Sequence, residues 1–179
     1  ADRLSEIVFH AKLGSIRDRV VRLSALASDI GTFVIGVDDQ SLRRAAVLCK
    51  ADLATGMVVE FPELQGVMGK YYALMQGESD AVAEAIFSHY APLGPTMPCP
   101  KEPNSVCLAL SDKIDVLVGM FAAGERATGS KDPFALRRAA LGIIRIILEN
   151  GVRASLAKIV HFSSKTYESQ GIDCGEEVA

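Results

Sequence analysis

Two aspartates lie among apolar residues, and their carboxylates are the groups in this chain that could hold a metal ion. Asp52 lies on a predicted helix among apolar residues, and Asp112 lies in a long stretch that is apolar on nearly every side. Burying a carboxylate costs free energy unless a cation or hydrogen-bond donors compensate it. A metal ion would supply that compensation. An ion pair with Lys50 or Lys113, or a bond to backbone amides, is the commoner solution, and we favour it here.

The histidines and cysteines do not complete a metal site. His10, His89 and His161 are scattered singly, and none adjoins an aspartate. A lone histidine is more often a core or surface residue than a ligand. The four cysteines have neither C-x-x-C spacing nor a histidine at zinc-ligand distance. We therefore predict no structural metal, and reduced thiols suit a cytoplasmic chain.

Basic residues surround the start of a predicted helix and could bind an anion. Lys131 precedes this helix, and Arg137, Arg138 and Arg145 lie within it. The free amides at a helix start favour anions such as phosphate. Alternatively, Asp132 caps the helix, and the basic side chains are solvated or pair with acidic neighbours. From the residues alone, we favour this second interpretation.

The segment 124–131 has the glycine spacing of a phosphate-binding loop but not the chemistry of one. Its lysine and hydroxyl residue are inverted relative to G-x-x-x-x-G-K-[ST]. It also follows a predicted helix rather than a strand. We therefore do not assign nucleotide binding to this segment.

The composition suits one compact core and gives no overall attraction to nucleic acid. Of the 179 residues, 49% are hydrophobic, which is enough for a single domain. The net charge of -3 means that any contact with RNA must be local. No apolar run reaches the roughly 18 to 20 residues of a membrane span, and no leader pattern is visible. We expect a cytoplasmic protein that does not bind a membrane.

The apolar residues recur at spacings of three and four, which predicts an all-α fold. We predict helices over residues 2–13, 16–30, 39–60, 63–76, 80–90, 105–123, 133–150 and 154–162. The proline-rich segment 91–104 is predicted to be an exposed loop. Together these elements form one helical domain over residues 1–168. The acidic stretch 169–179 is predicted to be frayed or disordered.

Particular residues are expected to begin and end these helices. Ser15 should cap the second helix, and Gly31 should end it in a left-handed turn. Pro62 should open the fourth helix, because proline is tolerated in a first turn. Asp132 and Pro133 form a cap and first-turn pair for the helix that ends near residue 150.

Four runs of the sequence, read together, resemble one protein family. They occur in the expected order and span most of the chain, and strings of this length are far more specific than a short motif. The runs are RAAVLCKADL (44–53), EFPELQGVMG (60–69), ALSDKIDVLVG (109–119) and TGSKDPFALRRAA (128–140). They resemble the central region of the β subunit of bacterial heterotetrameric glycyl-tRNA synthetase.

This resemblance implies an internal fragment of a longer subunit, with a domain similar to the HD phosphohydrolase fold. Active members of that fold are helical bundles that hold a divalent metal with histidines and aspartates. The match to their His-Asp pair reads Ala51-Asp52. Asp112 corresponds to the terminal aspartate, and His10 lies near the expected first histidine. Because one ligand is missing, we expect a degenerate HD domain without a bound metal.

The resemblance also implies a division of labour between subunits. In the family, glycine activation by ATP and transfer to tRNA occur on the α subunit, so ATP and magnesium would bind there. The β subunit is needed for tRNA recognition and a working tetramer, which makes the α subunit, the rest of the β subunit and tRNA-Gly the expected partners. We expect no catalytic residue in this chain.

Within this resemblance, the basic residues become candidate contacts to RNA or to another subunit. They are Lys131, Arg137, Arg138 and Arg145. Two alternative functions stay open, a metal-dependent HD-type phosphohydrolase and a purely structural spacer.

Overall fold

Helices make up almost all of the regular structure of this chain, as its apolar spacing predicts. The computed structural model describes residues 2–127 and 132–175. Within these ranges the α-helices are α1 Ile16–Gly31, α2 Asp39–Leu48, α3 Gly56–Glu60, α4 Val67–Met75, α5 Asp80–Ser88, α6 Pro103–Ala122, α7 Leu136–Asn150 and α8 Leu156–Glu168. The short 3-10 helices are η1 Asp2–Ser5, η2 Ala51–Ala54 and η3 Pro62–Leu64. The prediction of an all-α fold is confirmed, and the likeness to HD domains stays a prediction.

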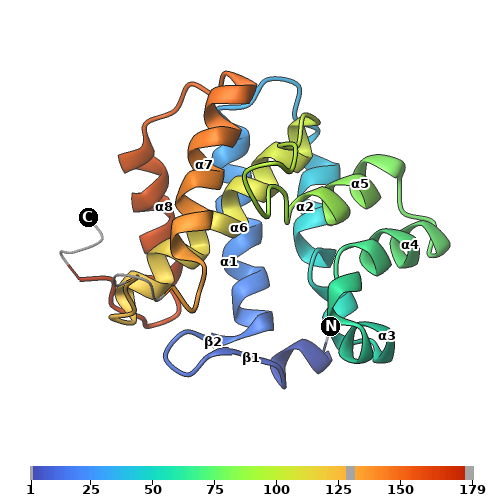
Figure 1. Ribbon diagram of the computed structural model, residues 1–179, viewed down its shortest axis with the longest axis horizontal. Coiled ribbons are helices and arrows are strands. Elements are labelled where there is room, and N and C mark those ends of the chain that lie inside the picture. Colours follow the sequence, from blue (N-terminus) through green and yellow to red (C-terminus); the bar gives the residue numbers. More distant parts are fainter. Residues whose placement is uncertain (1, 128–131, 176–179) are drawn as a thin grey trace.

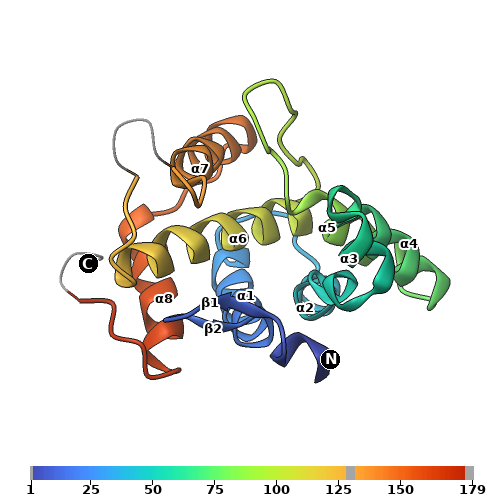
Figure 2. The same ribbon diagram turned by 60° about the horizontal axis from the view of Figure 1, so that its bottom comes forward.

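One long helix, α6, lies at the centre of the molecule. Figures 1 and 2 show α6 crossing the middle, with α7 on one side and α1 and α8 on the other. The helices α2 and α5 contact α6 as well. The core is therefore arranged around a single helix.

The sequence of α6 explains its central place. Every residue from Asn104 to Asp115 is buried. A helix that is apolar on nearly all sides is stable only when neighbours surround it. Its buried polar residues must then find partners on those neighbours. No helix in the described part of the chain is both long and apolar enough to cross a lipid bilayer.

The helix α1 begins as the sequence predicts but ends differently. Ser15 Oγ accepts from Asp18 N–H, and the Asp18 carboxylate accepts from Ser15 N–H, which forms a capping box. Gly31 stays within the helix, and Thr32 in a right-handed conformation forms the C-cap. The predicted left-handed turn at Gly31 is wrong, because the Thr32 amide reaches the last carbonyls without one.

Residues 2–13 do not form the predicted helix. After η1, the strands β1 Val8–His10 and β2 Gly14–Ser15 form an antiparallel hairpin, in which Gly14 has a φ of 84°. The apolar side chains of this segment serve two separate clusters. Leu4 packs with Ile16, whereas Leu13 belongs to the main core. One helix would direct these apolar side chains along a single face and could not place them in both clusters. The segment therefore forms a hairpin instead of the predicted helix.

The predicted helix over 39–60 is broken at Lys50. The helix α2 ends at Leu48, and η2 and α3 follow as separate pieces. Lys50 is only 2% exposed, and its ammonium is turned into the core toward Asp112. Thr55 then starts α3 by accepting from Val58 N–H. The continuous helix was a wrong prediction, because the chain breaks where Lys50 turns inward.

Pro62 opens the short helix η3 instead of the long helix predicted over 63–76. Gly66, with a φ of 80°, separates η3 from α4. A Cβ at Gly66 would lie 2.9 Å from the ring of Tyr90, so the chain passes close to α5 there. Gly77, with a φ of 83°, follows the end of α4 as predicted.

The second half of the chain follows the predictions more closely. Ser79 Oγ accepts from Val82 N–H at the start of α5. The proline-rich segment is irregular as predicted, but α6 begins at Pro103 rather than at residue 105. The prediction of an exposed loop is wrong in part, because Ala91 and Cys99 are buried. The helix α8 begins beside its cap, Ser155, and extends further than the predicted end at residue 162.

Asp132 caps α7 from further away than predicted. Its carboxylate accepts from Leu136 N–H at 2.7 Å and from Arg137 N–H at 3.0 Å. Pro133 precedes the helix rather than occupying its first turn, and Ala135 takes a left-handed φ of 57°. The capping aspartate is confirmed, whereas the predicted start of the helix at Pro133 is wrong.

The C-terminal segment keeps contact with the helices as far as the structure describes it. The Gln170 side chain accepts from Arg22 NH1 and donates to Asp18 O. Cys174 is only 6% exposed. Residues 176–179 of the predicted frayed stretch lie outside the described residues.

Gly119 marks the closest approach of α8 to α6 and gives a test of this packing. A Cβ at Gly119 would overlap the hydroxyl of Tyr167 and lie 3.0 Å from Leu13 Cδ1. We expect Gly119→Ala to lower the free energy of unfolding by about 1–3 kcal/mol, because the packed core cannot yield. Urea denaturation measures this change. Gly56→Ala is the control, since its Cβ would meet nothing within 4 Å, and equal effects of the two variants would contradict this view of the core.

Candidate functional site

The polar residues of α6 meet cations from neighbouring elements in a buried cluster. Asp112 Oδ1 accepts from Lys50 Nζ at 2.8 Å and from Arg19 NH2 at 3.0 Å. Each of the three residues is 8% exposed or less. The structure thus shows an ion pair between Asp112 and Lys50, which is the commoner of the two interpretations weighed from the sequence.

Asp115 extends the cluster by one turn of α6. Its fully buried carboxylate accepts from Arg19 Nε at 3.2 Å and from Arg22 Nε at 2.8 Å. Arg22 NH1 also donates to Leu13 O and to Gln170 Oε1. The cluster therefore ties α1, α6, the N-terminal hairpin and the C-terminal segment together.

His89 and Tyr90 complete the surroundings of Lys50. Lys50 Nζ lies 2.8 Å from His89 Nε2 and 3.9 Å from the centre of the Tyr90 ring. His89 Nδ1 lies 2.6 Å from Ile86 O. These partners assign the proton of the neutral imidazole to Nδ1, which donates to the carbonyl, and leave Nε2 to accept from the ammonium.

Burial and charge act in opposite directions on the pKa values of this cluster. Burial disfavours the ionised form of Asp112, but Arg19 and Lys50 outweigh it and hold the Asp112 pKa well below its usual range. Burial also opposes the charge of Lys50, yet Asp112 raises the Lys50 pKa above its ordinary value. For Lys113, which donates to Tyr90 O, burial prevails and lowers the pKa to about 8. The central ion pair is therefore charged on both sides at neutral pH.

The groups around Asp112 do not suit a divalent metal. The nearest partners of its carboxylate are an ammonium and a guanidinium, which repel a metal cation. His89 Nε2 is engaged by Lys50. In the part of the chain that the structure describes, no group of three or more His, Cys, Asp or Glu side chains is placed to share a metal ion.

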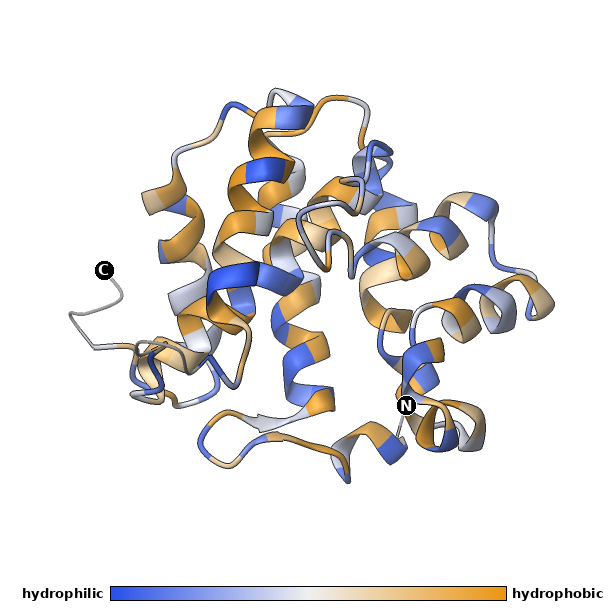
Figure 3. Cartoon of the chain, viewed as in Figure 1, coloured by the Kyte–Doolittle hydropathy of each residue, from blue (hydrophilic) through white to orange (hydrophobic). Residues whose placement is uncertain are grey.

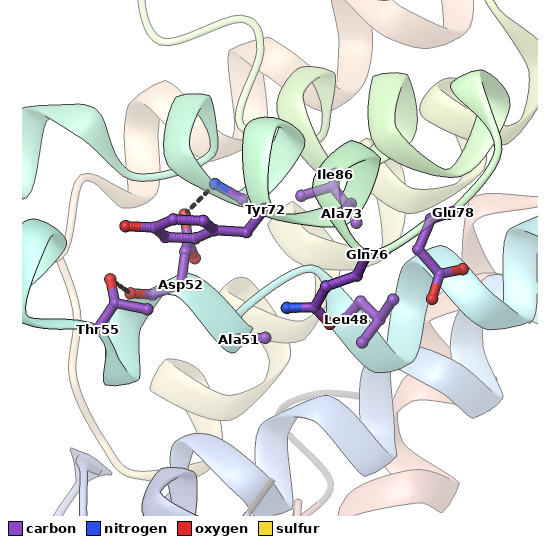
Figure 4. A pocket seen from close by; sticks show the side chains of 10 residues that line it. Leu48, Ala51, Asp52, Thr55, Tyr72, Ala73, Gln76, Glu78 and Ile86 are labelled. Carbon is purple, nitrogen blue, oxygen red and sulfur yellow. Dashed lines mark hydrogen bonds between the residues drawn. The ribbon is translucent and has the colours of Figure 1, made fainter.

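Asp52 lies in a different environment, shown in Figure 4. Its Oδ2 accepts from Gly66 N–H at 2.6 Å and from Gly69 N–H at 3.2 Å, which orders the approach to α4. It lines a cavity of about 240 Å³ together with Tyr72 and Gln76. Its Oδ1 has no hydrogen-bond partner among the described residues. Asp52 therefore links two segments of backbone and does not share the ion pair of Asp112.

His10 lies beyond the C-terminal end of α6. Its Nε2 is 3.6 Å from Glu125 Oε1, and its ring packs edge-on against Phe134 with the ring centres 5.7 Å apart. The structure does not bring together the three residues that the HD resemblance implied. His10, Asp52 and Asp112 have separate partners.

Most members of the buried cluster were not predicted from the sequence. Lys50 and Asp112 were expected as a possible ion pair, whereas Arg19, Arg22 and Asp115 were given no role. One signal could have found them, because α1 carries two arginines and α6 carries two aspartates at a spacing of three. Residues three apart share a helix face, so the two pairs can face each other.

The predicted basic surface is only partly assembled in the described residues. Lys131 lies outside them. Arg137 and Arg138 are exposed, and their side chains make no ion pair with the described part of the chain. Arg145 is engaged, since it pairs with Glu149 Oε1 at 2.9 Å and donates to Gly94 O. Two of the four candidates are thus available for an outside partner.

Comparison with known proteins points to one family. The family model described as "Glycyl-tRNA synthetase beta subunit" matches residues 1–178. Three similar curated proteins are each named "Glycine--tRNA ligase beta subunit". That of Paracoccus denitrificans (strain Pd 1222) is 53% identical over 158 residues, which are 88% of this chain and 23% of the relative.

The other two relatives give the same result. That of Cereibacter sphaeroides (strain ATCC 17029 / ATH 2.4.9) is 52% identical over 89% of this chain and 23% of its own length. That of Rhodospirillum centenum (strain ATCC 51521 / SW) is 54% identical over 86% of this chain and 22% of its own length. The chain spans less than a quarter of the length of these relatives.

His89 makes the stability of the buried cluster depend on pH. Burial, and then the nearby Lys50, lower the His89 pKa well below 6.5 in the folded chain. Below about pH 6.5, His89 is therefore protonated in the unfolded chain but stays neutral in the folded chain. The contribution of the neutral His89 to the free energy of unfolding is present above about pH 6.5 and is lost as the pH falls. We expect the free energy of unfolding, measured in urea, to fall less steeply from about pH 7 to about pH 5 in His89→Gln than in the wild type.

The control for this experiment is His161→Gln, which removes an exposed imidazole from α8. A loss of slope as large in His161→Gln as in His89→Gln would contradict the assignment to the buried histidine.

Proposed function

Because this chain belongs to the glycyl-tRNA synthetase beta subunit family, we propose that its helical bundle is a non-catalytic platform within such a subunit. The whole enzyme would charge tRNA with glycine at the expense of ATP. The platform would support tRNA recognition and the architecture of the subunit. The names of the relatives support the activity of the whole enzyme, and the geometry of the buried cluster supports the role of this part.

One observation carries the platform role, which is that cationic side chains of the chain itself compensate two buried acids of α6. Asp112 and Asp115 are held by Lys50, Arg19 and Arg22. The Asp112 carboxylate is a poor general base, because its charge is already stabilised and its pKa is depressed. It is a poor metal ligand for the same reason. Such a cluster stabilises a fold and does not react.

The remaining roles would fall to other parts of the enzyme. We propose that ATP and magnesium bind the α subunit, where glycine is activated, and that this chain needs neither. Its partners would be the α subunit, the rest of the β subunit and tRNA-Gly. The exposed Arg137 and Arg138 are available for one of these partners. None of the three relatives described above carries a phosphohydrolase name, and no contact in the described residues favours that alternative.

The test removes the central ion pair from the full α plus β enzyme while keeping its net charge. We expect Lys50→Met combined with Asp112→Asn to retain glycine-dependent ATP–pyrophosphate exchange and tRNA aminoacylation within about twofold of the wild type, because neither side chain would touch a substrate. Both rates are measured at a temperature where circular dichroism shows the fold intact.

The control is Asp112→Asn alone, which leaves the Lys50 ammonium buried without its partner. We expect this single variant to be destabilised by about 3–5 kcal/mol. Aminoacylation lost in the well-folded double variant would contradict the platform role. So would metal-dependent phosphatase activity in the wild type that Asp112→Asn abolishes.

A further inference from the structure

The helix α7 carries an apolar stripe on the side that faces away from the molecule. Its inner face is formed by Leu136, Gly142, Ile143 and Ile146, which are buried. On the outer face, Leu141 is 62% exposed, Ile144 is 49% exposed and Leu148 is 75% exposed. Figure 2 shows α7 lying on one side of α6, and Figure 3 shows hydrophobic residues along its length.

The spacing of this stripe is that of a helix-packing seam. Leu141, Ile144 and Leu148 are three and then four residues apart, which places them in one line along the helix. The same alternation of three and four repeats in the a and d positions of coiled coils, where such side chains insert between those of a second helix. Single exposed leucines are ordinary. Three branched side chains in register indicate a surface that another helix covers.

The charges around the stripe indicate what kind of helix would fit. Arg137 lies one turn before Leu141 on the same face, and Arg138 is beside it. Neither makes an ion pair with the described residues. Further along α7, Arg145 is already paired with Glu149. An apolar helix with acidic residues opposite the start of α7 would complement this surface.

Nucleic acid fits the stripe less well than protein does. The phosphate backbone is bound by cations and hydrogen-bond donors, and bases stack on aromatic or guanidinium planes. The side chains of Leu141, Ile144 and Leu148 offer neither. Burial of three branched alkyl groups against another apolar surface is favourable, because it removes their apolar area from water.

We propose that Leu141, Ile144 and Leu148 are the docking surface for an amphipathic helix from the part of the same β subunit that this chain does not include. The relatives are long enough to supply it, because this chain covers only 23% of the Paracoccus denitrificans relative. A segment of the same polypeptide is also present at a high effective concentration, which favours it over a separate partner. This inference rests on the proposed place of the chain in such a subunit.

The first test is the reactivity of a thiol at position 148 in the full-length β subunit. We expect Leu148→Cys in the folded subunit to react with a maleimide at least about tenfold more slowly than the same variant does in urea, because the docked helix covers it. Equal rates in the two conditions would overturn the proposal.

Two further arms of this experiment separate the possible occupants. The rate is measured for the β subunit alone, with the α subunit and with tRNA-Gly. Protection that appears only with the α subunit would assign the stripe to the subunit interface, and protection only with tRNA would assign it to RNA. Either result would overturn the proposal, and protection in the β subunit alone supports it.

A second variant keeps the proposal testable if Leu148→Cys does not fold. We expect Leu141→Asp to lower the Tm of the full-length subunit by at least about 2–4 °C, because an aspartate would be buried in the seam. The matched control is Val59→Asp in α3, where the side chain is 71% exposed and outside the stripe. Equal Tm values for the two variants would overturn the proposal. Neither measurement depends on aminoacylation, so their failure is distinct from failure of the proposed function.

Discussion

The buried carboxylates of Asp112 and Asp115 are the constraint on which the rest of the fold depends. They lie on the helix that the whole core surrounds, where an uncompensated charge is not tolerated. Arg19 must therefore come from α1, and Lys50 must turn inward from the end of α2. The interruption of the helix at Lys50 follows from this demand, and the N-terminal hairpin adds Leu13 O as a further partner of Arg22.

The same demand supports the proposed role of the bundle as a platform over a catalytic role. A buried acid can be compensated by a metal, which keeps positions open for a substrate, or by fixed side chains, which do not. Here the compensation is built from α1 and from the residue that directly precedes Ala51-Asp52. Asp52 is committed to the amides of Gly66 and Gly69. These carboxylates therefore hold helices and backbone segments together through ion pairs and hydrogen bonds.

The helical class, the central place of α6 and most of the later helices could be predicted from the sequence, because apolar spacing and caps are local signals. The failures share one physical cause. Residues 2–13 and 39–60 are helical by local pattern, but contacts with distant residues override it. The segment 2–13 supplies two separate apolar clusters, and Lys50 turns toward Asp112. A pair between Asp112 and Lys50 was among the predicted alternatives. Arg19, which lies 93 positions away from Asp112 in the chain, received no role, because the spacing of like charges on a helix does not by itself identify their partner. Tertiary demands of this kind leave little trace in local periodicity.

The helix α7 is apolar on two faces, and the core around α6 covers only one of them. Its inner face meets α6 closely enough that a Cβ at Gly142 would lie 2.8 Å from Lys113 Cε, so that face is complete. Its outer face is apolar as well, and a helix that is apolar on two sides is normally covered on both. The loop at 32–37 adds Ile35, which is 97% exposed. A bundle whose central helix is largely buried, but whose surface keeps an apolar stripe, is suited to pack against another segment, as the proposed platform role requires.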